Sequence, residues 1–312
     1  MSGVAGSVNR RLILDLYHSA ADANIMRAAV EFAKLLGLDL HCLFIEDEAV
    51  FTLAGLPFAR EIRLPAHQWG PLNQDIIARE LRETADHTRR LLNEVLRGVE
   101  IVSRFEVLRG DPATCITAVC QSGDIVIVAE PGAAVVRTMR TLRRLHAAAH
   151  ASPASVLLLP PRHKARPGHV VAVLATPTDP ALDVACRIAV AANENLTILL
   201  PQPADEAVVE RAKERARSLG LHPARVTCRT VPSCRGDDVV LALAGLQERA
   251  IVMSCSAAAA DNASSASRIA AARGVPVLLI EGQPSAAQHA GSRQNNPSSA
   301  TEKVSASSSA KS

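Results

Sequence analysis

One order of apolar runs and helix-like segments occurs twice in this chain. In the first copy, the runs that predict strands are residues 12–16, 39–45, 101–108, 124–128 and 155–159. In the second copy, the corresponding runs are residues 170–174, 196–200, 224–231, 250–253 and 276–280. Segments with helical spacing lie between the runs of both copies, and self-similarity of this kind indicates two copies of one supersecondary unit.

Alternation of strands and helices predicts parallel sheets that are covered on both faces. We therefore expect an α/β protein with two doubly wound, mostly parallel five-stranded sheets and helices on both faces. The first domain is predicted over residues 1–160, with an insert at 46–73, and the second over 168–282. Residues 283–312 are rich in Ser, Ala, Gln and Asn, which predicts a disordered tail.

The composition narrows the classes of partner. The formal net charge of the 312 residues is only +3, and aromatic residues make up 2% of the chain. A nucleic-acid-binding protein needs a stronger basic field and aromatic side chains for base stacking, so we expect no nucleic acid partner. All seven aromatic residues precede residue 106, which predicts aliphatic cores elsewhere.

The cysteines and the apolar runs point to a cytoplasmic protein with no membrane span. The seven cysteines are scattered and contain no Cys-x-x-Cys pair, so we expect reduced thiols and no metal site. The first apolar run is too short for a signal peptide, and no run approaches the ~20 residues of a membrane span.

The insert has no counterpart of similar length in the second copy. It contains Phe51, Phe58 and Trp69, which we interpret as a partner surface or a lid. The alternative is that these side chains cap the open end of the first sheet.

Ligands of doubly wound sheets bind beyond the carboxyl ends of the strands, where the strand order reverses. Tyr17, His18 and Ser19 follow the first strand, and their hydroxyl and imidazole groups could orient a polar ligand. A basic helix over 135–149 carries Arg137, Arg140 and Arg144 near one face, which predicts either an anion site or a solvated face. No nucleophile motif or neighbouring carboxylate indicates catalysis, and Ser19 also fits a helix N-cap.

The turn Gly110-Asp111-Pro112-Ala113, the strand at 124–128 and the closing sequence SVLLLP at 155–160 resemble the universal stress protein family in its tandem form. The resemblance implies a doubly wound fold. It also implies pairing through the last strand of each domain, which a tandem chain would form internally as a pseudo-dimer, with a further homodimer as an open alternative.

Many members of that family bind ATP, and this chain departs from their motifs. Tyr17 and Ala175 stand where those members carry an Asp, and only Gly132 remains of the glycine loop in the first copy. Residues 254–262 contain no glycine, so Cβ atoms occupy positions where a phosphate needs bare backbone. We therefore expect neither copy to bind ATP in the usual way.

These observations predict a non-catalytic binding protein of the stress response or of regulation, without a cofactor. It would bind a protein partner or a small ligand through a first-copy cleft formed by Tyr17, His18, Ser19, Gly110, Gly132, Arg137 and Arg140, together with the insert. The alternative is an ATP- or AMP-binding stress protein with a divergent loop around Gly132. An enzyme is a third class, for which no catalytic constellation is found.

Overall fold

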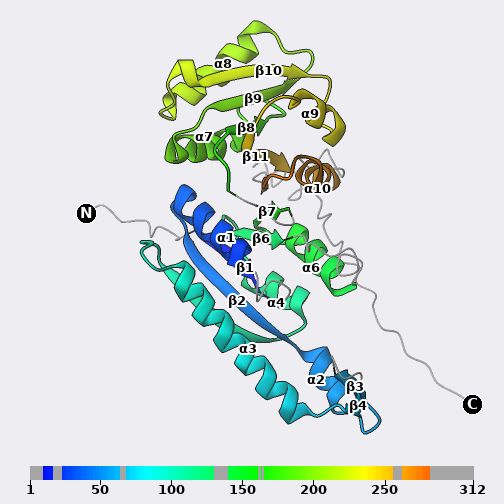
Figure 1. The fold of residues 1–312 in the computed structure, drawn as a ribbon. Coiled ribbons are helices and arrows are strands. Elements are labelled where there is room, and N and C mark those ends of the chain that lie inside the picture. The colour runs from blue at the N-terminus through cyan, green and yellow to red at the C-terminus, as the bar shows by residue number, and fades with distance from the viewer. Residues whose placement is uncertain are drawn as a thin grey trace, which may run out of the picture. The chain divides into compact units, whose positions relative to one another are not determined.

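The computed structural model describes residues 10–16, 23–63, 68–129, 140–160, 163, 165–255 and 262–281. The elements of the first half are β1 (Arg11–Asp15), α1 (Ala23–Leu36), β2 (Asp39–Asp47), α2 (Glu48–Ala54), β3 (Arg60–Arg63), β4 (Gln68–Pro71), α3 (Gln74–Val95), β5 (Ser103–Gly110), α4 (Pro112–Val119), β6 (Ile125–Ala129), α6 (Arg140–Ala151) and β7 (Ser155–Leu159). Their order is drawn in Figure 1. The tail predicted to be disordered lies outside the described residues.

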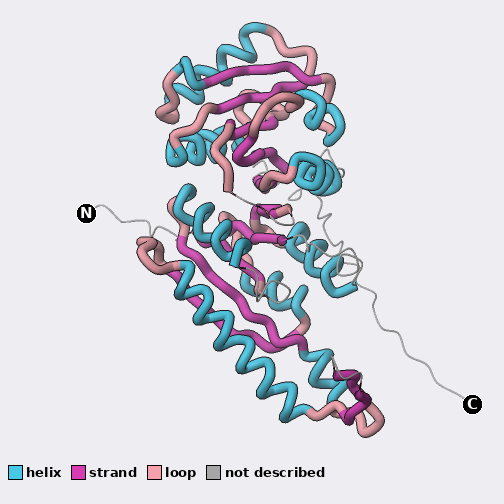
Figure 2. Tube along the Cα trace, viewed as in Figure 1, coloured by secondary structure: helices cyan, strands magenta, loops and turns pink. Residues whose placement is uncertain are grey.

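The second half repeats the alternation of strands and helices, which Figure 2 colours separately. Its elements are β8 (His169–Val173), α7 (Pro180–Ala192), β9 (Leu196–Pro201), α8 (Glu206–Ser218), η1 (Pro223–Arg225), β10 (Val226–Val231), α9 (Gly236–Ala242), β11 (Glu248–Cys255), α10 (Asn262–Arg273) and β12 (Val277–Glu281). No helix in the described part of the chain is both long and apolar enough to cross a membrane.

One ten-stranded sheet contains all the strands except β3 and β4. Its order is β10-β9-β8-β11-β12-β7-β6-β1-β2-β5. The first, second, third, fourth and fifth strands of each half therefore lie in the same relative order, with the fifth strands adjacent at the centre. All neighbours are parallel except β7 and β12, which are antiparallel.

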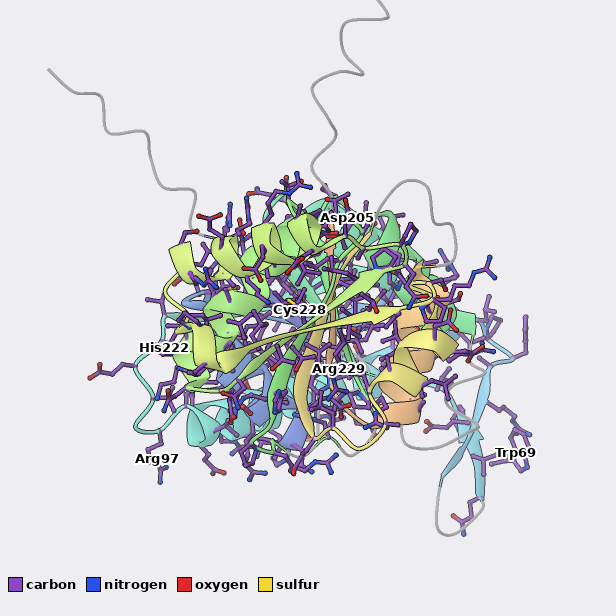
Figure 3. The ribbon with its side chains drawn as sticks, turned by 90° about the horizontal axis from the view of Figure 1, so that it is seen from above. Trp69, Arg97, Asp205, His222, Cys228 and Arg229 are labelled. Carbon is purple, nitrogen blue, oxygen red and sulfur yellow. The ribbon has the colours of Figure 1, made fainter. Side chains whose placement is uncertain are left out.

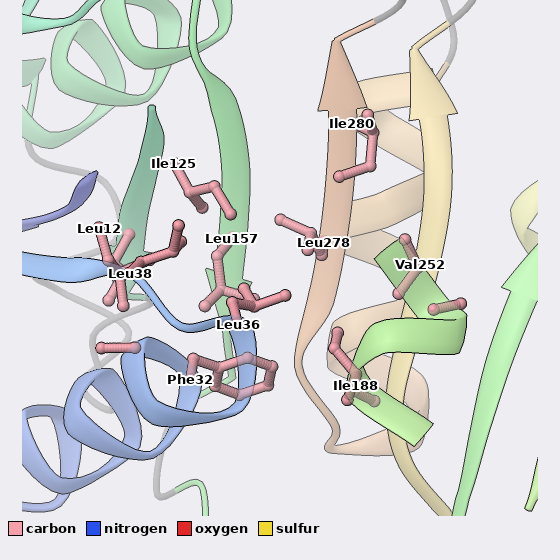
Figure 4. Packing of buried hydrophobic residues seen from close by; sticks show 14 of the residues in the cluster. Leu12, Phe32, Leu36, Leu38, Ile125, Leu157, Ile188, Val252, Leu278 and Ile280 are labelled. Carbon is pink, nitrogen blue, oxygen red and sulfur yellow. The ribbon is translucent and has the colours of Figure 1, made fainter. Parts of the chain in front are cut away.

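The prediction of two five-stranded sheets is wrong, because β7 and β12 join the halves. Leu158 pairs with Val277, and Leu157 pairs with Leu278. Both leucines of the second pair are fully buried, and Figure 4 shows them across the junction of the two strands. Pairing satisfies the N–H and C=O groups that two edge strands would otherwise leave open. The α/β architecture with helices on both faces is confirmed.

Two hydrophobic cores, one on each face of the sheet, run through both halves. One face packs against α1, α3, α7 and α8, and the other against α4, α6, α9 and α10. The alternation of side chains along β1 illustrates the rule, since Leu12 and Leu14 join the first core and Ile13 joins the second. Both cores therefore continue across the junction of β7 and β12. No observation tests the predicted domain boundaries at residues 160 and 168, which stay predictions.

Polar contacts also cross from one half to the other beside α1. Arg249 forms ion pairs with Glu31 at 2.6 Å and with Glu194 at 3.3 Å. Arg187 donates a hydrogen bond to the carbonyl oxygen of Leu36, the last residue of α1. These contacts hold α1 of the first half against the second half on the face that buries the first core.

Candidate functional site

The strand order reverses between β1 and β6 in the first half and between β8 and β11 in the second. The carboxyl ends of these strands define the two crevices in which ligands of this architecture bind. In the first half, residues 17–22 and 130–139 are next to those strand ends in the sequence. Tyr17, His18, Ser19, Gly132 and Arg137 therefore lie outside the described residues, and their predicted roles stay predictions.

Asp15 is the last residue of β1 and lies at the first crevice. It is only 7% exposed, an unusual environment for a carboxylate at a strand end. Its charge contributes to raising the pKa of Cys115 on α4, after burial and after Asp111. Sequence reasoning did not single out Asp15, although an acidic residue that ends an otherwise apolar strand is a signal that could have done so.

Asp111 caps the N-terminus of α4 and also binds the basic helix. Its side chain accepts hydrogen bonds from the Thr114 amide at 3.1 Å and the Thr114 hydroxyl at 3.0 Å. Arg144 lies 3.0 Å from the other carboxylate oxygen. Burial alone would raise the pKa of Asp111, but these hydrogen bonds and the charge of Arg144 outweigh burial and lower it.

The ion pair between Arg144 and Asp111 connects α6 with the N-terminus of α4. Arg140 is the first residue of α6, and the position of its side chain lies outside the described part. Gly110 precedes Asp111 and has a steric role, because a Cβ atom there would lie 3.0 Å from Sγ of Cys115. The structure thus shows contacts within the chain for Gly110 and Arg144, and their predicted roles in ligand binding stay predictions.

In the second half, the side chain of Asp179 lies between the carboxyl ends of β8 and β11. This residue is the N-cap of α7, and it is only 5% exposed. One carboxylate oxygen accepts hydrogen bonds from the Ala181 amide at 2.9 Å and from the Ser254 hydroxyl, and the other accepts from the Ala175 amide at 3.1 Å. Ala175 follows β8 and Ser254 belongs to β11, so one side chain connects both strands of the switch point with the helix.

The insert begins with a helix whose aromatic residue packs against the end of the sheet. Arg109 lies over the ring of Phe51, at 4.0 Å from the ring centroid. The same guanidinium donates two hydrogen bonds to the buried Glu46, at 2.6 and 2.9 Å. Gln74 donates to the carbonyl oxygen of Phe51 at 2.9 Å. The contact with Arg109 favours the interpretation of Phe51 as a cap on the first sheet.

Phe58 and Trp69 behave differently from Phe51. Phe58 is 76% exposed and Trp69 is 65% exposed. Trp69 belongs to the separate β3–β4 hairpin, where it pairs directly with Ile62, and Figure 3 shows it on the hairpin outside the helices that cover the sheet. Neither side chain caps the sheet, so the structure divides the three predicted aromatic residues into one anchor and two exposed side chains.

Burial lowers the reactivity of the described cysteine thiols. Burial raises the pKa of Cys42 and of Cys186 to about 12 and that of Cys120 to about 11. It also raises the pKa of Cys228 and Cys234. A thiol with a raised pKa is a poor nucleophile and a poor metal ligand. Among the described residues, no group of three His, Cys, Asp or Glu side chains could hold a metal ion.

Comparison with known proteins identifies the fold. No protein-family model and no curated protein matches the sequence. The structure is similar to that of a universal stress protein from Archaeoglobus fulgidus, with a TM-score of 0.61 and 16% sequence identity, over 88% of this chain and 96% of that one.

A protein from Pseudomonas aeruginosa, described as a candidate universal stress protein, matches with a TM-score of 0.50 and 15% identity over 88% of this chain and 94% of its own. The fold is therefore that of universal stress proteins, as the resemblance predicted.

Proposed function

We propose that this chain is a non-catalytic binding protein of the stress response or of regulation, and that it binds its partner through the first half. The observation that carries the proposal is the exposed apolar surface of the insert. The described chain has eleven large hydrophobic residues that are exposed, and six of them belong to the insert: Val50, Leu53, Leu56, Phe58, Ile62 and Trp69. We call these six residues the insert patch. An exposed patch of this kind marks an interaction site in a folded protein.

The two crevices support the same assignment. In the second half, the carboxylate of Asp179 lies where strands and helix N-terminus converge, which disfavours an anionic ligand there. In the first half, Asp15 places a buried carboxylate at the end of β1, and Asp111 engages Arg144. A nucleotide phosphate would face acidic side chains and would have to compete for one arginine of the basic helix. The two halves together would form the pseudo-dimer implied by the family resemblance, through β7 and β12.

Nucleotide binding is tested on the full chain. The protein is purified under native conditions, denatured, and the released small molecules are identified by mass spectrometry. We expect no stoichiometric nucleotide and no thermal stabilisation by ATP or AMP. Binding at a concentration of 100 times Kd would add about 2.7 kcal/mol to the free energy of unfolding. Stoichiometric ATP or AMP would overturn the proposal in favour of a nucleotide-binding stress protein.

Partner binding through the insert patch is tested by capture with the immobilised full chain. The double variant Phe58→Ala, Trp69→Ala should lose what the wild type captures. Leu241→Ala is the matched control, because Leu241 is 72% exposed but belongs to α9 in the second half. If the control loses capture and the double variant retains it, the binding surface lies elsewhere.

A further inference from the structure

The insert patch consists of side chains that the rest of the chain leaves uncovered. The hairpin β3–β4 forms a two-stranded sheet of its own, and Ile62 and Trp69 are direct cross-strand partners on one of its faces. Exposures of 48% for Ile62 and 65% for Trp69 show that no described residue covers this pair fully. A two-stranded hairpin is only marginally stable alone in water, so its apolar face gains most from a covering surface.

We propose that the insert patch is a self-association surface and that its occupant is the insert patch of a second copy of this chain. The proposal rests on the proposed function, in which the insert is the binding surface, and names the partner. It places the two copies around a two-fold axis at the hairpin. This contact is separate from the β7–β12 junction, which is already formed inside one chain.

The size of the patch fits such a dimer. Aromatic side chains bury roughly 150–250 Å² each, so Phe58 and Trp69 with the four aliphatic residues expose on the order of 500 Å². Two facing patches would remove about 1,000 Å² from water, at the lower limit of specific interfaces. The area therefore fits a reversible dimer better than a permanent one.

The charges around the patch also suit a second copy. Glu48 at the start of α2 and Arg60 at the start of β3 are both exposed, and they carry opposite charges. An interface around a two-fold axis is formed by the same surface on both copies, so a surface that carries both signs can pair with itself, whereas a surface of one sign would repel itself. A surface for an anionic membrane or for nucleic acid would instead be basic throughout.

The edges of the hairpin favour packing through side chains over strand addition. Pro71 in β4 has no N–H group and cannot donate to a further strand. The apolar side chains of the patch are therefore expected to form the contact.

The only tryptophan of the chain is Trp69, so intrinsic fluorescence reports directly on this surface. For the full-length wild type, we expect the molar mass from sedimentation velocity to rise from monomer toward dimer between ~1 and ~100 μM. Over the same range, the tryptophan emission should shift to shorter wavelength, and quenching by acrylamide should decrease. A constant monomer mass with constant emission would overturn the proposal without any variant being needed.

Phe58→Ala leaves the reporter in place and removes a side chain that is already 76% exposed, so the monomer should fold normally. We expect its dimer to be at least about tenfold weaker than that of the wild type, as for truncation of an interface aromatic. Leu241→Ala should dimerise like the wild type. A dimer of unchanged strength in Phe58→Ala, with Trp69 still quenched as in the monomer, would place the contact elsewhere and overturn the proposal.

The two proposals fail in different ways. If the chain stays monomeric but still captures another molecule through the insert patch, the self-association proposal falls and the proposed function stands. If the chain dimerises through the patch but is purified with stoichiometric nucleotide, the self-association proposal stands and the proposed function falls.

Discussion

The two halves of the sheet share one strand order and differ in the contacts and segments that their described residues add to it. In the second half, the carboxylate of Asp179 connects β8, β11 and the first turn of α7. In the first half, the corresponding strand ends lead to Asp15, and the insert adds a large apolar surface beyond β2. The comparison teaches that one scaffold can connect its switch-point strands with a helix through one side chain, and can carry an exposed apolar surface on an inserted segment.

The largest expected effect is on the hydrogen bonds of Asp179 in the second half. Asp179→Ala removes an N-cap and leaves the Ala175 amide without its acceptor, so we expect a loss of about 2–4 kcal/mol in the free energy of unfolding. Asp111→Ala is the matched control, since Asp111 also caps a helix that begins with proline but has a partly exposed carboxylate. We expect about 1 kcal/mol for that variant.

Urea unfolding of both variants measures this difference. Equal losses in the two variants would mean that Asp179 is an ordinary helix cap. The hydrogen bonds of Asp179 to Ala175 and Ser254 would then add no stability beyond that of the cap.

The second expected effect separates the anchor of the insert from its exposed side chains. Phe51→Ala removes a half-buried ring that packs under Arg109, and we expect a loss of about 1–2 kcal/mol. Phe58→Ala and Trp69→Ala should each change stability by no more than about 0.5 kcal/mol, because both rings are already exposed. Denaturant midpoints give the three values. A loss of more than 1 kcal/mol for Trp69→Ala would show that the hairpin side chains also cap the sheet.

The sequence predicted the strands and helices well because their signals are local. Apolar runs mark the strands, and the pairs Asp111-Pro112 and Asp179-Pro180 mark two helix starts, all of which the structure confirms. The family resemblance predicted the internal pairing of the two last strands, which β7 and β12 confirm. Local patterns alone could not predict the single sheet, because these strands are separated by more than a hundred residues and their pairing depends on register. Apolar strands that will form an edge and strands that will form a junction have the same composition.

The candidate site was harder to predict for the same reason. The pair Asp179-Pro180 is a local helix-start signal, but the bond of Asp179 to Ser254 joins residues 75 positions apart. Phe51 and Phe58 are the same residue type in one insert, and only the distant Arg109 makes one of them an anchor. Asp15 was visible in the sequence as an acid at the end of an apolar run, and its burial appears only when α4 packs over the sheet.

The smallest expected effect concerns the amino ends of the strands, where the halves again differ. In the first half, Arg11 on β1 and His41 on β2 lie side by side, with 3.5 Å between a guanidinium nitrogen of Arg11 and Nδ1 of His41. In the second half, His169 on β8 and Thr197 on β9 form a hydrogen bond, with 2.9 Å between Nδ1 of His169 and Oγ1 of Thr197. Thr197 and His41 occupy equivalent places, since each lies opposite the third residue of the preceding strand. His41→Thr therefore gives the first half the residue of the second.

Burial lowers the pKa of His41, as do the charges of Arg11 and Arg104, although the contact with Glu106 opposes this. Below the ordinary value of about 6.5, the unfolded chain binds a proton at this position that the folded chain does not bind, so stability falls as the pH decreases. His41→Thr should make the decrease in unfolding midpoint between pH 7 and pH 5 shallower. Above about pH 8 the two proteins should differ by a constant amount, because the histidine is then neutral in both the folded and the unfolded state. An equal or steeper decrease in the variant would contradict this prediction. His41 would then not be a source of acid sensitivity in the first half.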